Sequence, residues 1–333
     1  MSKHRTKILF VYSNFSSFVA RDHAILASVY QVEQYRFRAI KGLAGTGIEM
    51  IKQLFFLIVN IRKYKAVYVW FADYHSLLPV LFARLLNKKS FVVVGGYDVS
   101  YLPEYNYGSF NRPLRKFCAR AALRLATLCF PVAQALGEKI RKISPGSTIE
   151  VLPTTTDFTK FDISRLERKK TILTVATTEN QQRAMIKGLD RFRELAEAIP
   201  DFEFTIIGIK ETFLSFFEPL PGNLKIVPSV TYDELPAYYN QASFYAQFSR
   251  SEGLPNSLCE AMLCGCIPLG TDVGDIRLTI EEIGLVISEW NLSDLPGFIR
   301  INHNNEQLRK LSRDRIIEMY DPEIRENRLI RLI

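Results

Sequence analysis

Two glutamates, Glu252 and Glu260, lie eight positions apart in a segment whose residue types can bind a polar ligand, RSEGLPNSLCEAMLCGCIPLGTDVGD. Gly253 and Pro255 stand between them and break the chain into a turn, after which residues 258–263 are good helix formers. The pattern therefore predicts one carboxylate on a loop and the other on a helix. Because carboxylates accept hydrogen bonds from hydroxyl groups, each glutamate is a candidate ligand for a polyol.

The start of this helix supplies the rest of the candidate site. Asn256 or Ser257 can cap it, and a helix start directs unpaired backbone N–H groups outward, where they favour a bound anion. A phosphate between two polyols fits the whole pattern, and a nucleotide sugar is such a ligand. For either glutamate alone, a solvated residue beside a capped surface helix is the alternative. The ligand site is favoured because the loop, the helix start, the spacing and a following strand occur together.

The length and composition of the chain predict two globular domains. The chain has 333 residues, of which 47% are hydrophobic, and this is enough for two separate cores. The longest apolar stretch, at residues 54–59, is far shorter than the ~20 residues needed to cross a bilayer. Residues 1–15 turn polar after a few apolar positions, unlike a secretory signal. We therefore expect a cytoplasmic protein.

The 5 cysteines do not have the pattern of a disulfide framework or of a four-ligand zinc site. Cys264 and Cys266 are separated by a glycine, and we interpret them as a helix end that leads into a buried strand, because free cysteine is usually buried.

Charge is distributed unevenly along the chain. Residues 1–150 hold 22 lysines and arginines against 8 acidic residues, a net charge of +14, whereas residues 151–333 hold 21 against 27, a net charge of −6. The first half is therefore expected to face an anionic partner such as a membrane surface, a polyphosphate or an acidic polymer. Solubility of the surface is the alternative explanation. Nucleic acid is not expected as a partner, because the chain has no recognisable nucleic-acid-binding motif.

Strand-like and helical patterns alternate along the chain, as is typical of parallel sheets built from βαβ units. In the first half, strands are predicted at 7–12, 32–37, 66–71, 90–94, 128–132 and 149–152. Helices are predicted at 19–29, 46–62, 76–86, 112–126 and 135–143. These elements would make one doubly wound, Rossmann-like domain over residues 1–160.

A polar, basic stretch at residues 164–170 lacks apolar periodicity and is the expected hinge. A second domain of similar build is predicted over residues 165–317. Its strands are predicted at 171–176, 202–207, 224–227 and 244–247, and its helices at 189–199, 211–217 and 232–239. The final stretch at 306–333 is expected to be helical with a break at Asp321-Pro322, and its C-terminal helix, at 318–333, to pack back and complete the first domain. Ligands of such sheets bind at the carboxyl ends of the strands, which predicts a site in a cleft between the domains.

The chain resembles the retaining glycosyltransferases of family four, whose GT-B fold has two Rossmann-like domains facing a central cleft. The resemblance rests on SEGLPNSLCEAMLCGCIPLGTDVGD, on KGLD at 187–190, on FTIIGI at 204–209 and on FVVVGGYD at 91–98. It covers most of the chain, but only the motif in the second domain is specific.

The resemblance implies a donor site in the second domain. By this resemblance Glu252 contacts hydroxyls of the transferred sugar, and Glu260 contacts the ribose of the nucleotide. Backbone N–H groups would surround the diphosphate and sugar at Gly253, Leu254, Asn256, Ser257 and Leu258. Pro255 has no N–H to offer.

The family also places an arginine and a lysine where they neutralise the departing diphosphate. Lys187 of the KGLD stretch fits the lysine. The family's arginine position reads Val175-Ala176-Thr177, so we predict that Arg183 folds back into this role, with a solvated Arg183 as the alternative.

The first domain departs from the family pattern on the acceptor side. The loop after its FVVV strand reads Gly95-Gly96-Tyr97-Asp98 and lacks the histidine that relatives often carry, although the acid is retained. This loop gives four acceptor-side candidates, with simple packing as the alternative for Tyr97. His75 and Ser17 are two further candidates, and a capping or surface role is the alternative for His75.

The implied activity is transfer of a hexosyl group from a nucleotide diphosphate sugar to a glycan or lipid-linked acceptor with retention at the anomeric carbon, in synthesis of a cell-surface polysaccharide or glycolipid. A front-face displacement needs neither a protein base nor a metal, and no cofactor is expected. A nucleotide-sugar-binding scaffold and a sugar-nucleotide epimerase are the alternatives. Contact with an anionic membrane surface is predicted for the helix at 46–62, where core packing is the competing role.

Overall fold

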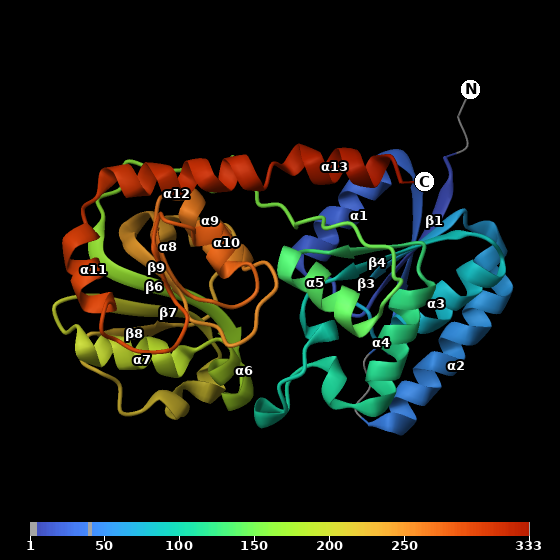
Figure 1. Cartoon of the computed structure of the whole chain (residues 1–333), viewed down its shortest axis with the longest axis horizontal. Helices are drawn as coiled ribbons and strands as arrows, with labels where there is room; N and C mark the ends of the chain where they lie inside the picture. Colours follow the sequence, from blue (N-terminus) through green and yellow to red (C-terminus); the bar gives the residue numbers. More distant parts are fainter. Residues whose placement is uncertain (1–4, 39–41, 333) are drawn as a thin grey trace. The chain divides into compact units, whose positions relative to one another are not determined.

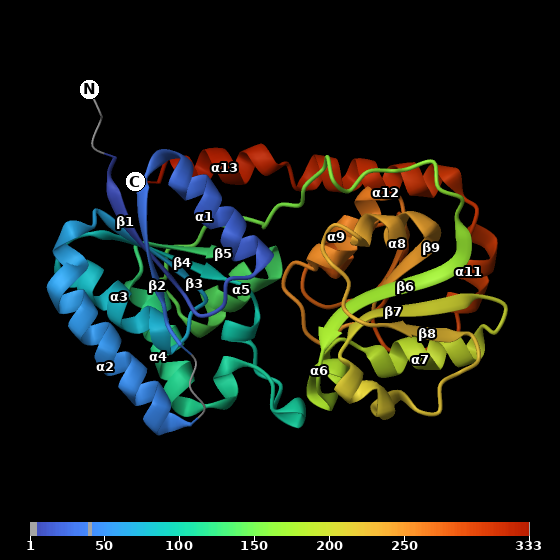
Figure 2. The ribbon, with the colours of Figure 1, turned by 180° about the vertical axis from the view of Figure 1, so that it is seen from behind.

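The computed structural model describes residues 5–38 and 42–332, which form two compact units. Unit 1 comprises Met1–Thr154 together with Glu323–Ile333, and unit 2 comprises Thr155–Pro322. Each unit contains one parallel sheet with helices packed against it (Figures 1 and 2). The chain therefore enters unit 1, builds all of unit 2, and returns to unit 1 at its end.

The sheet of unit 1 has five parallel strands in the order β2-β1-β3-β4-β5. Their bounds are Lys7–Tyr12 for β1, Gln31–Arg36 for β2, Ala66–Trp70 for β3, Lys89–Val94 for β4 and Leu128–Pro131 for β5. The strands inside the sheet are runs of buried apolar residues, as expected when helices cover both faces, while β2 at the edge is mostly polar and exposed.

The helices of unit 1 form two layers. The bounds are Ser17–Val29 for α1, Leu43–Asn60 for α2, Tyr74–Leu85 for α3, Pro113–Leu125 for α4 and Gln134–Ile143 for α5, with short 3-10 helices at Ile61–Lys63, Tyr97–Val99, Pro103–Tyr105 and Ser109–Asn111. The step from β1 to β2 runs along the sheet in the opposite direction to the later steps. Right-handed crossovers therefore place α1 on one face and α2, α3 and α4 on the other. Asp73 begins α3 with a capping box and also binds Arg115 of α4, which ties two neighbouring helices together.

The final helix, α13 (Pro322–Ile330), belongs to unit 1 and lies on the same side of its sheet as α1 (Figure 1). Arg325 of α13 makes a two-fold ion pair with Asp22 of α1, at 2.7 and 2.6 Å, and both side chains are buried. Tyr68 and Trp70 of β3 also donate hydrogen bonds to Asp22, at 2.7 and 2.9 Å. Arg325 further donates to the carbonyl oxygen of Leu152 at 2.6 Å. This one side chain therefore holds α13 to α1 and also to the last residues before the chain enters unit 2.

The sheet of unit 2 has six parallel strands in the order β11-β10-β9-β6-β7-β8. Their bounds are Lys169–Thr178 for β6, Glu203–Ile209 for β7, Leu224–Val227 for β8, Ala242–Gln247 for β9, Ile267–Thr271 for β10 and Leu285–Ile287 for β11. The helices are α6 (Gln181–Ile186), α7 (Leu189–Ala198), α8 (Leu235–Gln241), α9 (Asn256–Leu263), α10 (Ile276–Ile280), α11 (Leu295–Asn302) and α12 (Glu306–Met319), with a 3-10 helix at Glu211–Phe217.

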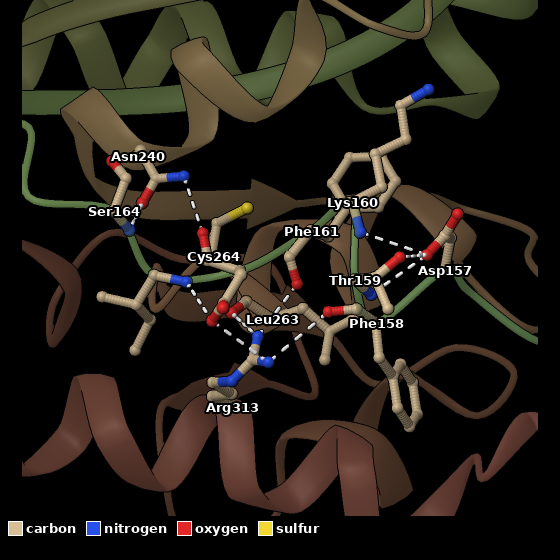
Figure 3. A network of polar contacts seen from close by, with 12 residues as sticks. Asp157, Phe158, Thr159, Lys160, Phe161, Ser164, Asn240, Leu263, Cys264 and Arg313 are labelled. Carbon is tan, nitrogen blue, oxygen red and sulfur yellow. Dashed lines mark hydrogen bonds and ion pairs between the residues drawn. The ribbon is translucent and has the colours of Figure 1, made fainter.

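The first residues of unit 2 are held in place by polar contacts from its body (Figure 3). Arg313 of α12 donates to the carbonyl oxygens of Phe161 and Leu263, at 2.9 and 2.8 Å. Asn240 of α8 accepts a hydrogen bond from the backbone of Ser164 at 2.8 Å, and Asp157 accepts bonds from the turn that follows it. Residues 157–164 are therefore part of unit 2.

The predicted architecture of two parallel-sheet α/β domains is confirmed, with differences in detail. The boundary between the units falls between Thr154 and Thr155, ahead of the basic stretch at 164–170. That stretch, the expected hinge, lies within unit 2, where Arg168 donates to the carbonyl oxygen of Ala242 at 2.6 Å and β6 begins at Lys169. The strand predicted at 149–152 is reduced to one bridge between Cys129 and Ile149.

We expect Arg325→Ala to lower the free energy of unfolding by about 3–5 kcal/mol, because Asp22 would remain buried without its counter-ion. The matched control is Arg328→Ala. Arg328 lies on the same helix and pairs with Glu150, but both side chains are more than a third exposed, so less than about 1 kcal/mol should be lost. Urea unfolding of both variants measures the difference, and equal losses would contradict the structural role of Arg325.

Candidate functional site

Lys187 and Glu252 form an ion pair at the carboxyl ends of neighbouring strands in unit 2. Glu252 follows β9, Lys187 follows β6, and the two strands are parallel neighbours, so their ends meet at one edge of the sheet. The Nζ of Lys187 lies 2.8 Å from Oε2 of Glu252. Ser249 and Gln247 donate to the same oxygen, at 3.0 and 3.4 Å. All three contacts converge on Oε2, which fixes the orientation of the carboxylate.

The sequence prediction does not include Ser249 and Gln247. Gln247 ends β9 and Ser249 follows it, and both side chains are buried. Polar side chains that are buried at the carboxyl end of a parallel strand are the available signal, because such groups must be paired and lie where ligands bind.

Arg250 joins the two motifs that carry Lys187 and Glu252. Its guanidinium makes a two-fold contact with Asp190 of the KGLD motif, at 2.7 and 2.6 Å, and its backbone N–H donates to the carbonyl oxygen of Ile186 at 2.7 Å. Gly188 adopts a left-handed backbone conformation with φ of 68°, and a β-carbon there would collide with the carbonyl oxygen of Phe248. The KGLD motif therefore needs its glycine and its aspartate in order to place Lys187.

The turn between Glu252 and α9 rests on a second glycine. Gly274 also has a positive φ, of 60°, and a β-carbon there would collide with the backbone of Glu252 and Gly253. The N–H of Asp275 donates to the carbonyl oxygen of Gly253 at 3.2 Å. The TDVGD end of the motif thus supports the turn from behind. The first turn of α9, at Asn256, Ser257 and Leu258, follows this turn directly. Leu254 is buried, and the N–H of Leu258 donates to the carbonyl oxygen of Pro255 at 3.0 Å.

Glu260 lies on α9, and its side chain is mostly buried. The hydroxyl of Tyr239 donates to its Oε2 at 3.2 Å. Burial and the charge of Glu260 hold the pKa of Tyr239 well above its ordinary value, so the phenol keeps its proton and stays a donor. The position of the Glu260 carboxylate is therefore fixed by a neutral partner.

Arg183 lies on α6, one helical turn before Lys187. The backbone N–H of Lys187 donates to the carbonyl oxygen of Arg183 at 2.9 Å, so the two side chains leave the helix on the same side. The Arg183 side chain is exposed, and its own N–H is capped by Asn180 at 2.9 Å. The short helix α6 is absent from the sequence prediction, and it is the element that brings the two cations into register.

In unit 1, the loop after β4 is organised around the buried carboxylate of Asp98. Its oxygens accept hydrogen bonds from the backbone N–H groups of Gly96 at 2.8 Å, Ala72 at 3.0 Å and Gly95 at 3.3 Å. Burial raises the pKa of Asp98 to about 6. Asp98 therefore shapes the Gly95–Gly96 turn from the inside, and Tyr97, which is 39% exposed, presents its ring at the surface beside Arg115.

The other two acceptor-side candidates differ in their surroundings. The ring of His75 is buried, and its Nε2 lies 2.7 Å from the carbonyl oxygen of Trp70, which makes this nitrogen the donor. Burial also lowers the pKa of His75, so the ring is neutral. His75 is therefore part of the core of unit 1 and not the surface or cleft residue that the sequence suggested. Ser17 is exposed at the first position of α1.

The described residues 5–38 and 42–332 contain no group of three or more His, Cys, Asp or Glu side chains arranged to hold a metal ion.

Two parallel-sheet α/β units of this topology define the GT-B fold, and solved structures with that fold superpose on nearly the whole chain. Sucrose-phosphate synthase from Thermosynechococcus elongatus matches with a TM-score of 0.78 and 14% identity, covering 98% of this chain and 97% of that chain. Anabaena HepE, solved in complex with UDP and glucose, matches with a TM-score of 0.71 and 13% identity, covering 97% and 98%. The lipopolysaccharide outer core galactosyltransferase WaaB matches with a TM-score of 0.66 and 13% identity, also covering 97% and 98%.

Identities this low establish the shared fold alone, and no curated protein matches the chain. The family model described as glycosyl transferases group 1 matches residues 169–296, which lie in unit 2 and contain Lys187, Glu252 and Glu260. The predicted resemblance to glycosyltransferases of GT-B fold is thereby confirmed: the fold is shared along the chain, and residues 169–296 are similar to the glycosyl transferases group 1 family.

The titration of Asp98 predicts a pH-dependent stability. Its pKa is raised from 3.8 to about 6 in the folded protein, so the folded state holds a proton that the unfolded chain has released. The free energy of unfolding should therefore fall as pH rises from about 4 to about 6, by at most about 3 kcal/mol from this group. In the Asp98→Asn variant residue 98 cannot ionise, so this decrease in the free energy of unfolding should be absent. Urea unfolding across that window compares the two proteins, and parallel curves would contradict the assignment.

Proposed function

We propose that the protein is a retaining glycosyltransferase that transfers a hexosyl group from a nucleotide diphosphate sugar to a glycan or lipid-linked acceptor. The ion pair between Lys187 and Glu252, beside the first turn of α9, carries the proposal. A cation, a carboxylate and a helix N-terminus at one sheet edge match a ligand that has an anionic diphosphate next to a sugar.

Glu252 is suited to bind sugar hydroxyls. Its Oε2 is held by Lys187, Ser249 and Gln247, whereas Oε1 accepts no hydrogen bond from any of the residues that the structure describes. The side chain is 14% exposed, so a bound hydroxyl would reach a carboxylate that is already oriented and mostly dry. An interaction formed without reorganisation is the kind that stabilises a transition state.

Lys187 would act on the leaving diphosphate. When the bond between the anomeric carbon and the diphosphate oxygen breaks, negative charge develops on that oxygen, and the ammonium group together with the positive end of α9 lowers its energy. The acceptor hydroxyl attacks the same face, forms the new glycosidic bond, and gives its proton to the departing phosphate. Arg183, one turn away on α6, is our candidate for the second cation, and it would have to turn its exposed side chain toward the ligand.

The remaining donor contacts follow from their positions. We propose that Glu260, whose carboxylate accepts a hydrogen bond from Tyr239, binds the ribose hydroxyls. The first turn of α9 is proposed to bind the diphosphate. The presence of UDP and glucose in the HepE structure supports a uridine nucleotide as the first donor to test.

The acceptor is proposed to meet unit 1 at Tyr97, the Gly95–Gly96 turn and Ser17. We further propose that transfer takes place in the cytoplasm, in the synthesis of a glycolipid or surface polysaccharide. The shared fold with WaaB, a galactosyltransferase of the lipopolysaccharide outer core, supports an acceptor of this class.

A nucleotide-sugar-binding scaffold is the second candidate function. One observation favours it. The side chain of Arg183 is exposed, whereas Lys187 contacts Glu252, so the second cation that the transfer mechanism needs is not in place. A scaffold would bind the donor through the same residues without consuming it.

We expect Lys187→Ala to lower kcat for sugar transfer by about 100-fold or more, with little change in thermal stability, because it removes charge stabilisation from the transition state. Arg183→Ala should also lower kcat. The matched control is Lys210→Ala, because Lys210 is an exposed cation of the same unit that pairs with Glu179 and should leave kcat unchanged.

The assay uses a panel of nucleotide sugars with glycan and lipid-linked acceptors, product detection by mass spectrometry, and NMR of the anomeric proton. Formation of the same anomer as in the donor supports retention, and the opposite anomer contradicts it. Donors that raise the melting temperature but are never consumed would favour the scaffold. Normal turnover by Lys187→Ala would refute the proposed role of the ion pair.

Transfer should be independent of divalent metal, since Lys187 and the α9 dipole are proposed to neutralise the diphosphate. Initial rates measured with and without EDTA, after dialysis against the chelator, should agree within about twofold. A rate that is lost with EDTA and restored by Mg²⁺ or Mn²⁺ would show that a metal supplies this charge instead.

A further inference from the structure

The outer side of α2 in unit 1 carries a continuous row of exposed apolar side chains. Ile48, Ile51, Phe55, Ile58 and Val59 are between 53% and 70% exposed. Ile48, Ile51, Phe55 and Ile58 recur every three or four residues and Val59 adjoins them, so the five residues line one side of the helix from residue 48 to residue 59. A row of five large exposed hydrophobic residues is unusual on a protein surface that faces only water, and it marks a contact surface.

The opposite side of α2 is bound to unit 1 by polar contacts. The buried amide of Gln53 donates to the carbonyl oxygen of His75 at 2.9 Å. Glu49, also buried, pairs with Lys52 at 2.7 Å and accepts a bond from the backbone of Arg38 at 3.4 Å. Leu57, one turn after Gln53, is buried in the core. The segment Ala44–Lys63 is long and apolar enough to cross a bilayer, but these contacts hold its inner side to the domain. Its geometry is that of a helix that lies in the plane of a membrane surface.

The end of α3 adjoins the end of α2, and exposed cations border the row. Leu85, the last residue of α3, is 71% exposed, and Lys88 just after it donates to the carbonyl oxygen of Arg62 at 3.3 Å, which joins the ends of the two helices. Lys52, Arg62 and Lys63 are exposed along or just beyond the row. Apolar side chains with a cationic border are complementary to anionic lipid headgroups over an acyl layer.

We propose that the α2 row, together with Arg62 and Lys63, is a docking surface for an anionic lipid membrane. The net charge of +14 in residues 1–150 supports this partner, because the whole unit is attracted to a negative surface. A second copy of the chain fits less well. A two-fold contact with the helices parallel would bring Arg62 and Lys63 of both copies together, which costs like-charge repulsion, and an antiparallel one would set them opposite the first turn of α2, which has no acidic residue.

The experiment is flotation of the full-length protein with vesicles, without donor or acceptor, so that its result does not depend on the proposed transferase activity. The wild-type protein should bind vesicles of phosphatidylcholine with phosphatidylglycerol, and bind pure phosphatidylcholine about tenfold less or worse. High salt should weaken binding to the anionic vesicles.

Two pairs of variants separate the apolar and cationic parts of the surface. Phe55→Ser combined with Ile58→Ser should lower binding to anionic vesicles about tenfold or more, and Arg62→Gln combined with Lys63→Gln should do the same. The matched controls lie in unit 2. Ile301→Ser removes an apolar side chain that is 81% exposed, and Lys225→Gln combined with Lys310→Gln removes two exposed cations. Both controls should bind like the wild type.

Melting curves verify that each variant is folded, and the cationic pair tests the proposal even if the apolar pair fails to fold. No binding to either vesicle, equal binding to both, or equal loss in the unit 2 controls would overturn the proposal. Light scattering measures the molar mass in solution and so tests a second copy of the chain as the partner. If the wild-type protein is a dimer and Phe55→Ser converts it to a monomer, the row is a contact between two copies of the chain and the proposal is overturned.

Discussion

The contact between Arg250 and Asp190 determines the geometry of the candidate donor site. It joins the end of β9 to the start of α7, and the backbone of Arg250 binds the end of α6 in addition. Lys187 lies in the sequence between these two contacts, which are made by Ile186 and Asp190, and it directly precedes Gly188 with its left-handed backbone conformation. Because a guanidinium and a carboxylate match each other in two parallel hydrogen bonds, the contact sets direction as well as distance. The ion pair of Lys187 with Glu252 follows from this frame.

Unit 1 uses an arginine and an aspartate in a related way, but in a buried setting. Asp22 receives hydrogen bonds from Arg325, Tyr68 and Trp70, and Arg325 also binds a backbone carbonyl group. Taking two charges out of water is costly, and the cost is offset only when the remaining polar atoms are paired as well. We therefore expect the pair to contribute specificity for one position of α13 more than net stability.

Local chemistry makes some elements predictable from the sequence. The buried strands are continuous runs of valine, isoleucine and phenylalanine, and α9 is recognisable because Gly253 and Pro255 precede good helix formers. Contacts between distant segments cannot be derived in this way. Nothing in the order of residues indicates that Asp190 faces Arg250, or that the charges at 168–170 are used within unit 2. The prediction for His75 is wrong because a lone histidine after a strand has the same pattern whether its ring is buried or exposed.

The return of α13 to unit 1 also affects the order in which the protein can fold during synthesis. Domains generally fold as units as the chain emerges. Residues 155–322 contain all of unit 2 and are complete before Arg325 is made, whereas Asp22 is made near the start. The partner of the buried Asp22 carboxylate is therefore synthesised only after the whole of unit 2. The half of the protein that is synthesised first is the half that is finished last.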